Sequence, residues 1–259
     1  MCSSHEIQAT INAIGFLDEG EYFKGSDCLN ALKDLTRYLK RDDPNEKNIR
    51  LELLKSDVLS NDLIPLLKII KPKKESVLFD IVLRLLVNLT QSALNCFELK
   101  VPNDKFHYNV FLEIDSQLKR VKKSFADEDF IRVLSERIND VMRKEWQDRP
   151  EEEELILERI LFLIRNILLI KCSEDDADRL ETDINSHDNL ILNFFKTDLT
   201  NHLIYMAHAS INKKYTIHIL EIINLMLREQ SAEELAKVSE NEVNLKSKRS
   251  QVEKERDIE

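Results

Sequence analysis

The stretch VLFDIVLRLLVNL, residues 77–89, indicates the fold class more strongly than any other part of the chain. Apolar side chains occupy most of its positions, and only a narrow polar row remains. The row consists of Asp80, Arg84, Asn88 and, just beyond the stretch, Gln91. A helix that is apolar almost all round must be covered by other elements on most sides. A layered array, in which inner helices lie between neighbouring helices, provides that cover.

The distribution of glycine supports a helical fold. The three glycines are Gly15, Gly20 and Gly25, and no glycine follows in the remaining chain. β-hairpins and phosphate-binding loops depend on glycine, and no stretch alternates apolar and polar residues convincingly. We therefore predict an all-α protein, namely a HEAT/armadillo-like α-solenoid of about ten helices with a charged C-terminal tail.

Apolar periodicity and capping residues predict the helix boundaries. The predicted ranges are 6–18, 26–40, 48–54, a helix containing LIPLLKII, and then 77–97, 102–125, 127–146, 151–170, 186–195, 198–209 and 215–229. We expect residues 1–232 to form one solenoid domain. Residues 233–259 are rich in charge and lack aromatic side chains, so we expect a flexible or solvated tail.

Composition excludes several classes of protein. Cys2, Cys28, Cys96 and Cys172 lie far apart, which is typical of free thiols in a reducing compartment. No secretory signal opens the sequence and no apolar run is long enough to span a membrane, so we expect an intracellular protein without a membrane partner. The net charge of −10 argues against a simple nucleic-acid clamp.

Three of the predicted helices carry an asparagine within an apolar run. The runs are LRLLVNLT with Asn88, LFLIRNIL with Asn166 and LEIINLML with Asn224. Burying an amide without partners costs about 1–3 kcal/mol, so each amide should bond to a neighbouring turn. We interpret the three as structural buried amides, as in the third helix of armadillo repeats. Three asparagines that face solvent by chance are the alternative.

No residues form a catalytic or metal-binding arrangement. Ser186, His187 and Asp188 are contiguous, so their side chains diverge around a helix start and cannot form a relay. The histidines of the last third of the chain lack the spacing of a metal pair. The four glutamates at 151–154 point in different directions and favour a helix N-terminus. We predict no enzymatic activity, no cofactor and no small-molecule substrate.

Basic residues offer two candidate contacts with phosphate. The helix carrying QLKRVKKSF is apolar on one face, and three cations project from the other; a basic loop precedes residue 77. The candidates are Lys119, Arg120 and Lys123 on the helix, and Lys71, Lys73 and Lys74 in the loop. They predict weak binding of duplex DNA. A solvated helix face explains them equally well.

The order of motifs along the chain resembles the N-terminal region of the Timeless family. The matching segments are AIGFLDEGEYFKGSDCLNALKDLTRYLKRDD, SNDLIPLLK, LFDIVLRLLVNLTQSALNCF, KKSFADEDFIRVLSERI, EEEELILERILFLIRNIL, SHDNLI and HILEIINLMLREQ. The resemblance covers about residues 1–235, with the segments in the same order, which is far more specific than a short motif. Members of the family are much longer than this chain.

The resemblance implies a function. It implies a non-enzymatic scaffold subunit of the replication fork protection complex, located in the nucleus and active in fork stability, checkpoint signalling and sister-chromatid cohesion. The implied partners are Tipin, the replicative helicase, polymerases and a Claspin-type mediator. The alternative is a circadian scaffold that binds Period, although GEYFKGSDCL and ELILERILFLIRNIL look more like the fork branch. A transport-type adaptor is less favoured, because Trp146 is the single tryptophan.

Overall fold

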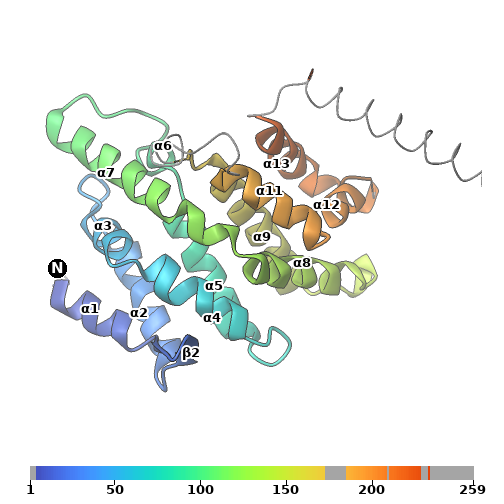
Figure 1. Ribbon diagram of the computed structural model, residues 1–259, viewed down its shortest axis with the longest axis horizontal. Coiled ribbons are helices and arrows are strands. Elements are labelled where there is room, and N and C mark those ends of the chain that lie inside the picture. Colours follow the sequence, from blue (N-terminus) through green and yellow to red (C-terminus); the bar gives the residue numbers. More distant parts are fainter. Residues whose placement is uncertain (1–3, 173–184, 209, 229–232, 234–259) are drawn as a thin grey trace, which may run out of the picture. The chain divides into compact units, whose positions relative to one another are not determined.

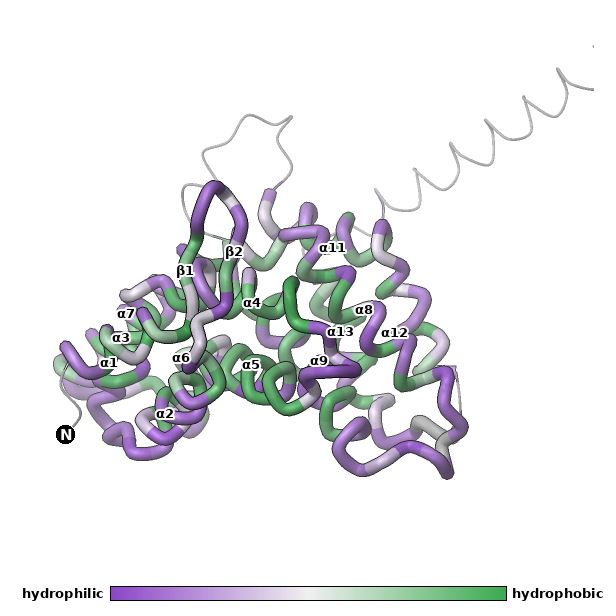
Figure 2. Tube along the Cα trace, turned by 90° about the horizontal axis from the view of Figure 1, so that it is seen from below, coloured by the Kyte–Doolittle hydropathy of each residue, from purple (hydrophilic) through white to green (hydrophobic). Residues whose placement is uncertain are grey.

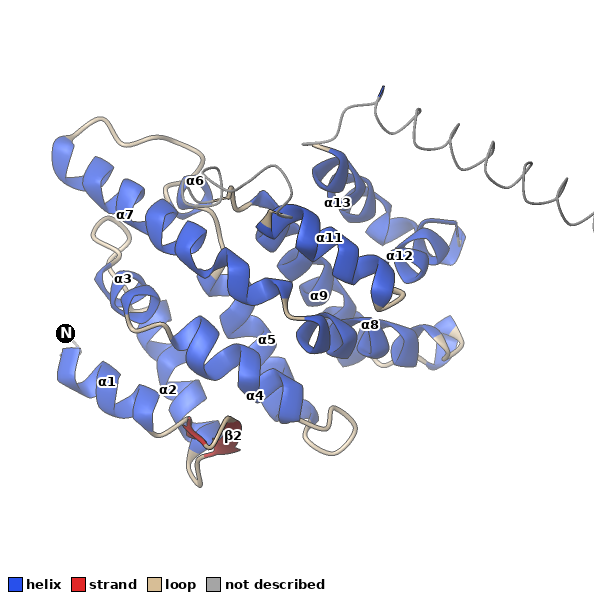
Figure 3. Ribbon diagram, viewed as in Figure 1, coloured by secondary structure: helices blue, strands red, loops and turns tan. Residues whose placement is uncertain are grey.

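The computed structural model describes residues 4–172, 185–208, 210–228 and 233 (Figure 1, Figure 3). The chain divides into two compact units, residues 1–222 and 223–259, and the second begins within the last helix that the structure describes. The predicted tail at 233–259 lies outside the described residues except for Glu233.

The described elements are almost all helical, which confirms the all-α prediction. In chain order the helices are α1 (Ser4–Asn12), α2 (Cys28–Lys40), α3 (Asn48–Lys55), α4 (Ile64–Ile69), α5 (Ser76–Leu89), α6 (Ala93–Cys96), α7 (Lys105–Val121), α8 (Glu128–Met142), α9 (Glu151–Leu169), α11 (Ser186–Lys196), α12 (Leu199–His208) and α13 (Thr216–Leu227). The strands β1 (Gly15–Asp18) and β2 (Glu21–Lys24) form an antiparallel hairpin.

The helices follow one another in triplets, α3–α4–α5, α7–α8–α9 and α11–α12–α13. Corresponding helices of successive triplets pack together: α3 on α7, α4 on α8, α5 on α9 and α8 on α12 (Figure 1). The start of α13 meets α9 through His218 and Phe162, whose ring centroids are 4.8 Å apart. Helices that stack on their equivalents bury a continuous core, as repeat arrays do. This stacking agrees with a layered array of helices.

Helix α5 lies at the centre of this packing, between α2, α4 and α9. Its apolar residues are buried on most sides, as the sequence predicts, and Figure 2 shows the hydrophobic colouring of α5 among its neighbours. The polar row meets α9, because Asp80 forms an ion pair with Arg159 as well as with Arg84 of its own helix. The buried side chains of α5 are Leu78, Phe79, Val82, Leu83, Leu85, Leu86 and Leu89.

The predicted helix at 77–97 is wrong in its second half. Helix α5 ends at Leu89, and the short helix α6 begins at Ala93. The hydroxyl of Thr90 donates to the carbonyl oxygen of Leu86 at 2.7 Å, which satisfies a carbonyl at the end of α5. Ser92 then caps α6 by accepting a hydrogen bond from the Asn95 backbone N–H at 3.2 Å.

Two further predictions are wrong: that one helix spans 6–18, and that the chain contains no strands. Helix α1 stops at Asn12, and β1 and β2 follow, joined by a two-residue turn. Glu19 has φ 47° and Gly20 has φ 88°, so both residues are left-handed. This is the pattern of a type I′ hairpin turn, whose twist matches that of the strands. Each strand is only four residues long, too short for a convincing period-2 signal.

Gly15 at the start of β1 is required by close packing. A Cβ at this position would lie 2.5 Å from the carbonyl oxygen of Phe23 and 2.5 Å from the hydroxyl oxygen of Tyr22. Both atoms belong to β2. The absence of a side chain therefore allows the two strands to approach and allows Tyr22 to lie across β1.

Candidate functional site

The three predicted phosphate contacts on the helix differ in whether an acidic side chain of the same chain already pairs with them. The ammonium of Lys119 lies 2.8 Å from Asp115, and the guanidinium of Arg120 lies 2.7 Å from Asp57. Lys123 is exposed and makes no ion pair within the described residues. Two of the three cations are therefore already paired, which weakens this surface as a phosphate-binding patch.

The basic loop before α5 also contains both paired and unpaired lysines. Lys73 forms an ion pair with Asp140 of α8 at 3.2 Å, while the side chains of Lys71 and Lys74 are exposed and unpaired in the described part of the chain. The loop lies against α8, whereas Arg120 lies against Asp57 beyond α3. The structure therefore fixes the two basic groups to different parts of the fold rather than joining them in one stripe.

Lys122, which directly precedes the candidate Lys123, is buried with 1 % of its surface exposed. Its ammonium donates a hydrogen bond to the carbonyl oxygen of Ile170 and lies 3.4 Å from Nδ1 of His187. The turn after α7 and the ends of α9 and α11 meet at this lysine. It therefore holds elements together and cannot reach a phosphate in solution.

Asn166 is the best-defined of the three asparagines. Its side chain is buried, and its amide nitrogen lies 3.1 Å from the carbonyl oxygen of Val87 and 3.3 Å from the hydroxyl of Thr90. Val87 belongs to the last turn of α5, where carbonyl groups lack partners within the helix. The amide of α9 thus reaches back to the equivalent helix of the preceding triplet and caps its end.

Asn88 and Asn224 differ from Asn166 and from each other. Asn88 is half-buried, and its side-chain and backbone oxygens each accept a hydrogen bond of 2.6 Å from the guanidinium of Arg50. Arg50 comes from α3, so this contact ties the first and third helices of one triplet. The side chain of Asn224 is exposed. The prediction of a buried amide there is wrong, because that position of α13 faces outward.

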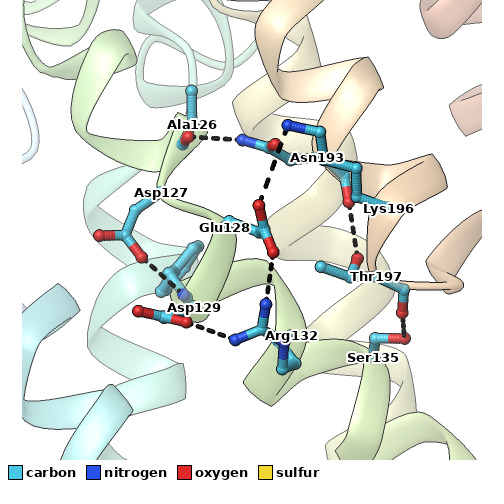
Figure 4. A network of polar contacts seen from close by, with 10 residues as sticks. Ala126, Asp127, Glu128, Asp129, Arg132, Ser135, Asn193, Lys196 and Thr197 are labelled. Carbon is cyan, nitrogen blue, oxygen red and sulfur yellow. Dashed lines mark hydrogen bonds and ion pairs between the residues drawn. The ribbon is translucent and has the colours of Figure 1, made fainter.

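A fourth asparagine, Asn193 of α11, escaped the sequence analysis (Figure 4). It is buried, and its amide nitrogen donates to the carbonyl oxygen of Ala126 at 2.7 Å. The Thr197 hydroxyl donates to the Asn193 carbonyl oxygen at 2.7 Å, and the Ser135 hydroxyl donates to the Thr197 carbonyl oxygen at 2.6 Å. The apolar run ILNFF around Asn193 carries the same signal as the other three runs.

Asp127 links α4 to α8 beside this network. Its carboxylate accepts a hydrogen bond from the Phe130 backbone N–H at 2.8 Å, which caps α8, and forms a 2.8 Å ion pair with Lys68. Burial opposes ionisation of Asp127, but the hydrogen bonds from Lys68 and Phe130 together hold its pKa below the ordinary value. The carboxylate is therefore ionised at neutral pH and stabilises the join between two triplets.

Large apolar side chains remain exposed on the last described helices. We call Phe195, Ile204, Tyr205, Ile217 and Leu220 the C-terminal apolar residues; they belong to α11, α12 and the start of α13. Exposed apolar residues gathered on neighbouring elements mark protein-binding surfaces more often than chance exposure does. A second set on and before α7 comprises Leu99, Val101, Phe106, Tyr108 and Leu112.

The sequence singled out two further motifs, at 186–188 and 151–154, and the structure shows what their described residues contact. Ser186 and His187 are buried at the start of α11. The glutamates of the first turn of α9 point in different directions: Glu153 pairs with Arg137 and Lys144, and Glu154 with Lys214. Among the described residues no group of three or more potential ligands is placed to hold a metal ion. None of the described helices has the length and apolar character needed to cross a membrane.

Comparison with known proteins identifies the family. The sequence model of the family described as Timeless protein matches residues 21–258. The chain belongs to the Timeless family. The mouse and human proteins named Protein timeless homolog are 38 % and 37 % identical to it over 235 residues, and the protein of that name from Caenorhabditis elegans is 32 % identical over 235 residues.

These alignments cover 90–91 % of this chain but only 17–19 % of the Timeless relatives. The chain therefore spans about a fifth of the length of the curated relatives it matches. The resemblance read from the sequence is confirmed at the level of the Timeless family. It supports a Timeless-type role, and none of the three relatives is named as an enzyme.

Proposed function

We propose that this chain is a non-enzymatic scaffold subunit of a nuclear replication fork protection complex. In this role it binds Tipin and replisome proteins, namely the helicase, polymerases and a Claspin-type mediator, and supports fork stability, checkpoint signalling and cohesion. The observation that carries the proposal is the match of the Timeless family model to residues 21–258, together with similarity to animal relatives over nine-tenths of the chain.

The C-terminal apolar residues are the surface on which we place Tipin docking. Ile217 is 75 % exposed and Tyr205 is 61 % exposed, although both lie on helices whose other faces are buried. A helical partner that covered these side chains would remove apolar area from water, which is the main favourable term in protein association. Aromatic residues such as Tyr205 are enriched among the strongest contributors to such interfaces.

Charge favours a protein partner over nucleic acid. Glu151 and Glu152, at the exposed start of α9, make no ion pair within the described residues, and the surrounding segment 151–200 has an excess of acidic side chains. Such a surface attracts basic partners and repels phosphate. Duplex DNA is therefore at most a weak ligand, which Lys71 and Lys74 would contact at one place and Lys123 at another. The logarithm of its affinity should fall with the logarithm of the salt concentration, with a slope of about −0.9 per phosphate contacted.

Co-purification tests the proposed function. Tagged Tipin is co-expressed with this chain and with a version extended well past residue 259, and each is carried through size-exclusion chromatography. We expect Tipin to remain with the extended version, and the double variant Tyr205→Asp, Ile217→Asp to reduce its retention. The matched control is Leu112→Asp, which alters an exposed leucine of α7 and should leave retention unchanged.

Two results would reject parts of this proposal. Equal loss of Tipin from the double variant and from Leu112→Asp would reject the docking surface. An extended version that retains Period but not Tipin would replace the fork function with the circadian one. In both experiments circular dichroism must show that the variants keep the helical content of the parent.

A further inference from the structure

The β1–β2 hairpin has two chemically different faces. In the strand register, Phe16 lies opposite Phe23 and Asp18 lies opposite Glu21. Residues two apart in a strand point to the same side, so these four side chains share one face. The other face carries Tyr22, which is opposite Leu17 in the register. Because neighbouring residues alternate between faces, the phenylalanines point away from the side on which Tyr22 is buried.

The inner face attaches the hairpin firmly to the helices. Tyr22 is 9 % exposed, and its hydroxyl donates a hydrogen bond of 2.9 Å to the carboxylate of Asp62, before α4. Lys24 forms an ion pair with Glu75 at the start of α5. A two-stranded hairpin is marginally stable alone, so these contacts fix its position. A partner would therefore meet a surface that is already in place, which lowers the entropic cost of binding.

The outer face presents an aromatic pair to solvent. Phe16 is 59 % exposed and Phe23 is 44 % exposed, and their rings stack with centroids 5.7 Å apart. Exposed phenylalanines on a held element are unlike single apolar residues scattered over a surface, and they form a contact area suited to another protein.

Acidic side chains surround the aromatic pair. Asp18, Glu19 and Glu21 are exposed, and none of them makes an ion pair within the described part of the chain. Figure 2 shows the hydrophilic tip of the hairpin projecting beyond the neighbouring helices. A guanidinium or ammonium at this tip would meet unpaired carboxylates, and it could lie over an aromatic ring, where cation–π attraction adds to the charge term.

We propose that the hairpin docks a segment of another protein in which arginine or lysine alternates with apolar side chains. The apolar side chains of that segment cover Phe16 and Phe23, and its cations meet Asp18, Glu19 and Glu21. A second copy of this chain does not fit, because the two tips would bring the same carboxylates together. Nucleic acid is excluded for the same reason, since phosphates would face these carboxylates.

Fluorescence anisotropy with synthetic peptides tests the proposal on the full chain. Three labelled peptides of equal length alternate leucine with arginine, leucine with glutamate, and serine with arginine. We expect the leucine–arginine peptide to bind at least about tenfold more tightly than either of the others. Equal binding of the serine–arginine peptide would reject the aromatic contribution, and equal binding of the leucine–glutamate peptide would reject the acidic one.

Two variants assign the binding to the hairpin. Phe16→Ser, Phe23→Ser removes the aromatic pair, and Asp18→Asn, Glu21→Gln removes two charges with little change in shape. Each should weaken binding of the leucine–arginine peptide about tenfold or more. The control Glu151→Gln, Glu152→Gln removes two exposed charges elsewhere and should leave affinity unchanged.

Unchanged affinity in the Asp18→Asn, Glu21→Gln variant, or equal loss in the control, would overturn the proposal. The charge variant keeps the test decisive even if the serine variant unfolds the hairpin. The result is independent of the proposed function. The peptide can fail to bind while Tipin is retained, and the peptide can bind while Tipin is lost.

Discussion

Replacing Asn166 by leucine tests whether its amide joins the successive triplets. Leucine has nearly the shape of asparagine, so Asn166→Leu removes the donor while creating little space. The Val87 carbonyl then loses its 3.1 Å hydrogen bond from α9 and keeps only a 3.3 Å contact with the Thr90 hydroxyl. Thr90 keeps its 2.7 Å bond to the Leu86 carbonyl oxygen. The damage is therefore concentrated on one buried carbonyl at the end of α5.

The expected cost follows from this geometry. A buried acceptor left without its partner costs about 1–3 kcal/mol. The added apolar surface of leucine offsets a part of this, since each buried methylene contributes about 0.8 kcal/mol. We expect a net loss of about 2 kcal/mol in the free energy of unfolding. For a chain of this size that loss lowers the melting temperature by about 4–8 °C.

Urea unfolding followed by far-UV circular dichroism measures the difference, provided that the slope of free energy against urea is unchanged. The matched control is Asn224→Leu, the third asparagine of the pattern, whose side chain is exposed. It should change stability by less than about 0.5 kcal/mol. If Asn166→Leu unfolds at or above the parent urea concentration, or if both variants lose the same stability, the capping role of Asn166 is wrong.

Three further predictions concern the hairpin, an ion pair and a thiol. Gly20→Ala should lower the free energy of unfolding by about 1 kcal/mol, because it places a Cβ at positive φ in open space. Gly15→Ala should lower it more, because the new Cβ would meet the backbone of β2. Urea unfolding that ranks the two variants in the opposite order would contradict this. The depressed pKa of Asp127, held by Lys68, contributes stability that is complete above the unfolded pKa of about 4 and is lost as pH falls through the lower folded value. Asp127→Asn, which can still cap α8, should therefore cost about 0.5 kcal/mol at pH 7 and nothing at the acid end, and a difference that persists unchanged at low pH would refute the ionic contribution. Burial raises the pKa of Cys28 to about 11, so this thiol should react with a disulfide reagent at neutral pH only after denaturant is added; rapid reaction in the native state would contradict its burial.

The sequence alone determined the fold class and most helix positions. The apolar character of 77–89 requires cover on most sides whatever the neighbours are. The structure buries most of these apolar residues, although Val77 at the start is 59 % exposed. The asparagine pattern also pointed to Asn166 because an amide inside an apolar run needs a partner wherever the run is buried. Periodicity could not separate Asn224 from the others, since exposure of a helix face depends on what packs against it.

For the basic residues, too, the sequence determined the position on the helix, and the tertiary structure determined which side chains are paired. Sequence spacing placed Lys119, Arg120 and Lys123 on one side of a helix, which depends only on the helical period. Whether those cations are free depends on residues distant in the chain, such as Asp57, which pairs with Arg120. The burial of Lys122 against the carbonyl of Ile170 is likewise a contact between elements, which helical periodicity does not specify.

The hairpin is the clearest feature that only tertiary structure decided. Residues 15–24 carry too short an alternation to identify strands, and their local signals are the glycines alone. The strands form because Tyr22 bonds to Asp62 and Lys24 pairs with Glu75, both far along the chain. Local sequence therefore determined the helices, through periodicity and capping, whereas contacts between distant residues determined the hairpin and the exposed aromatic pair.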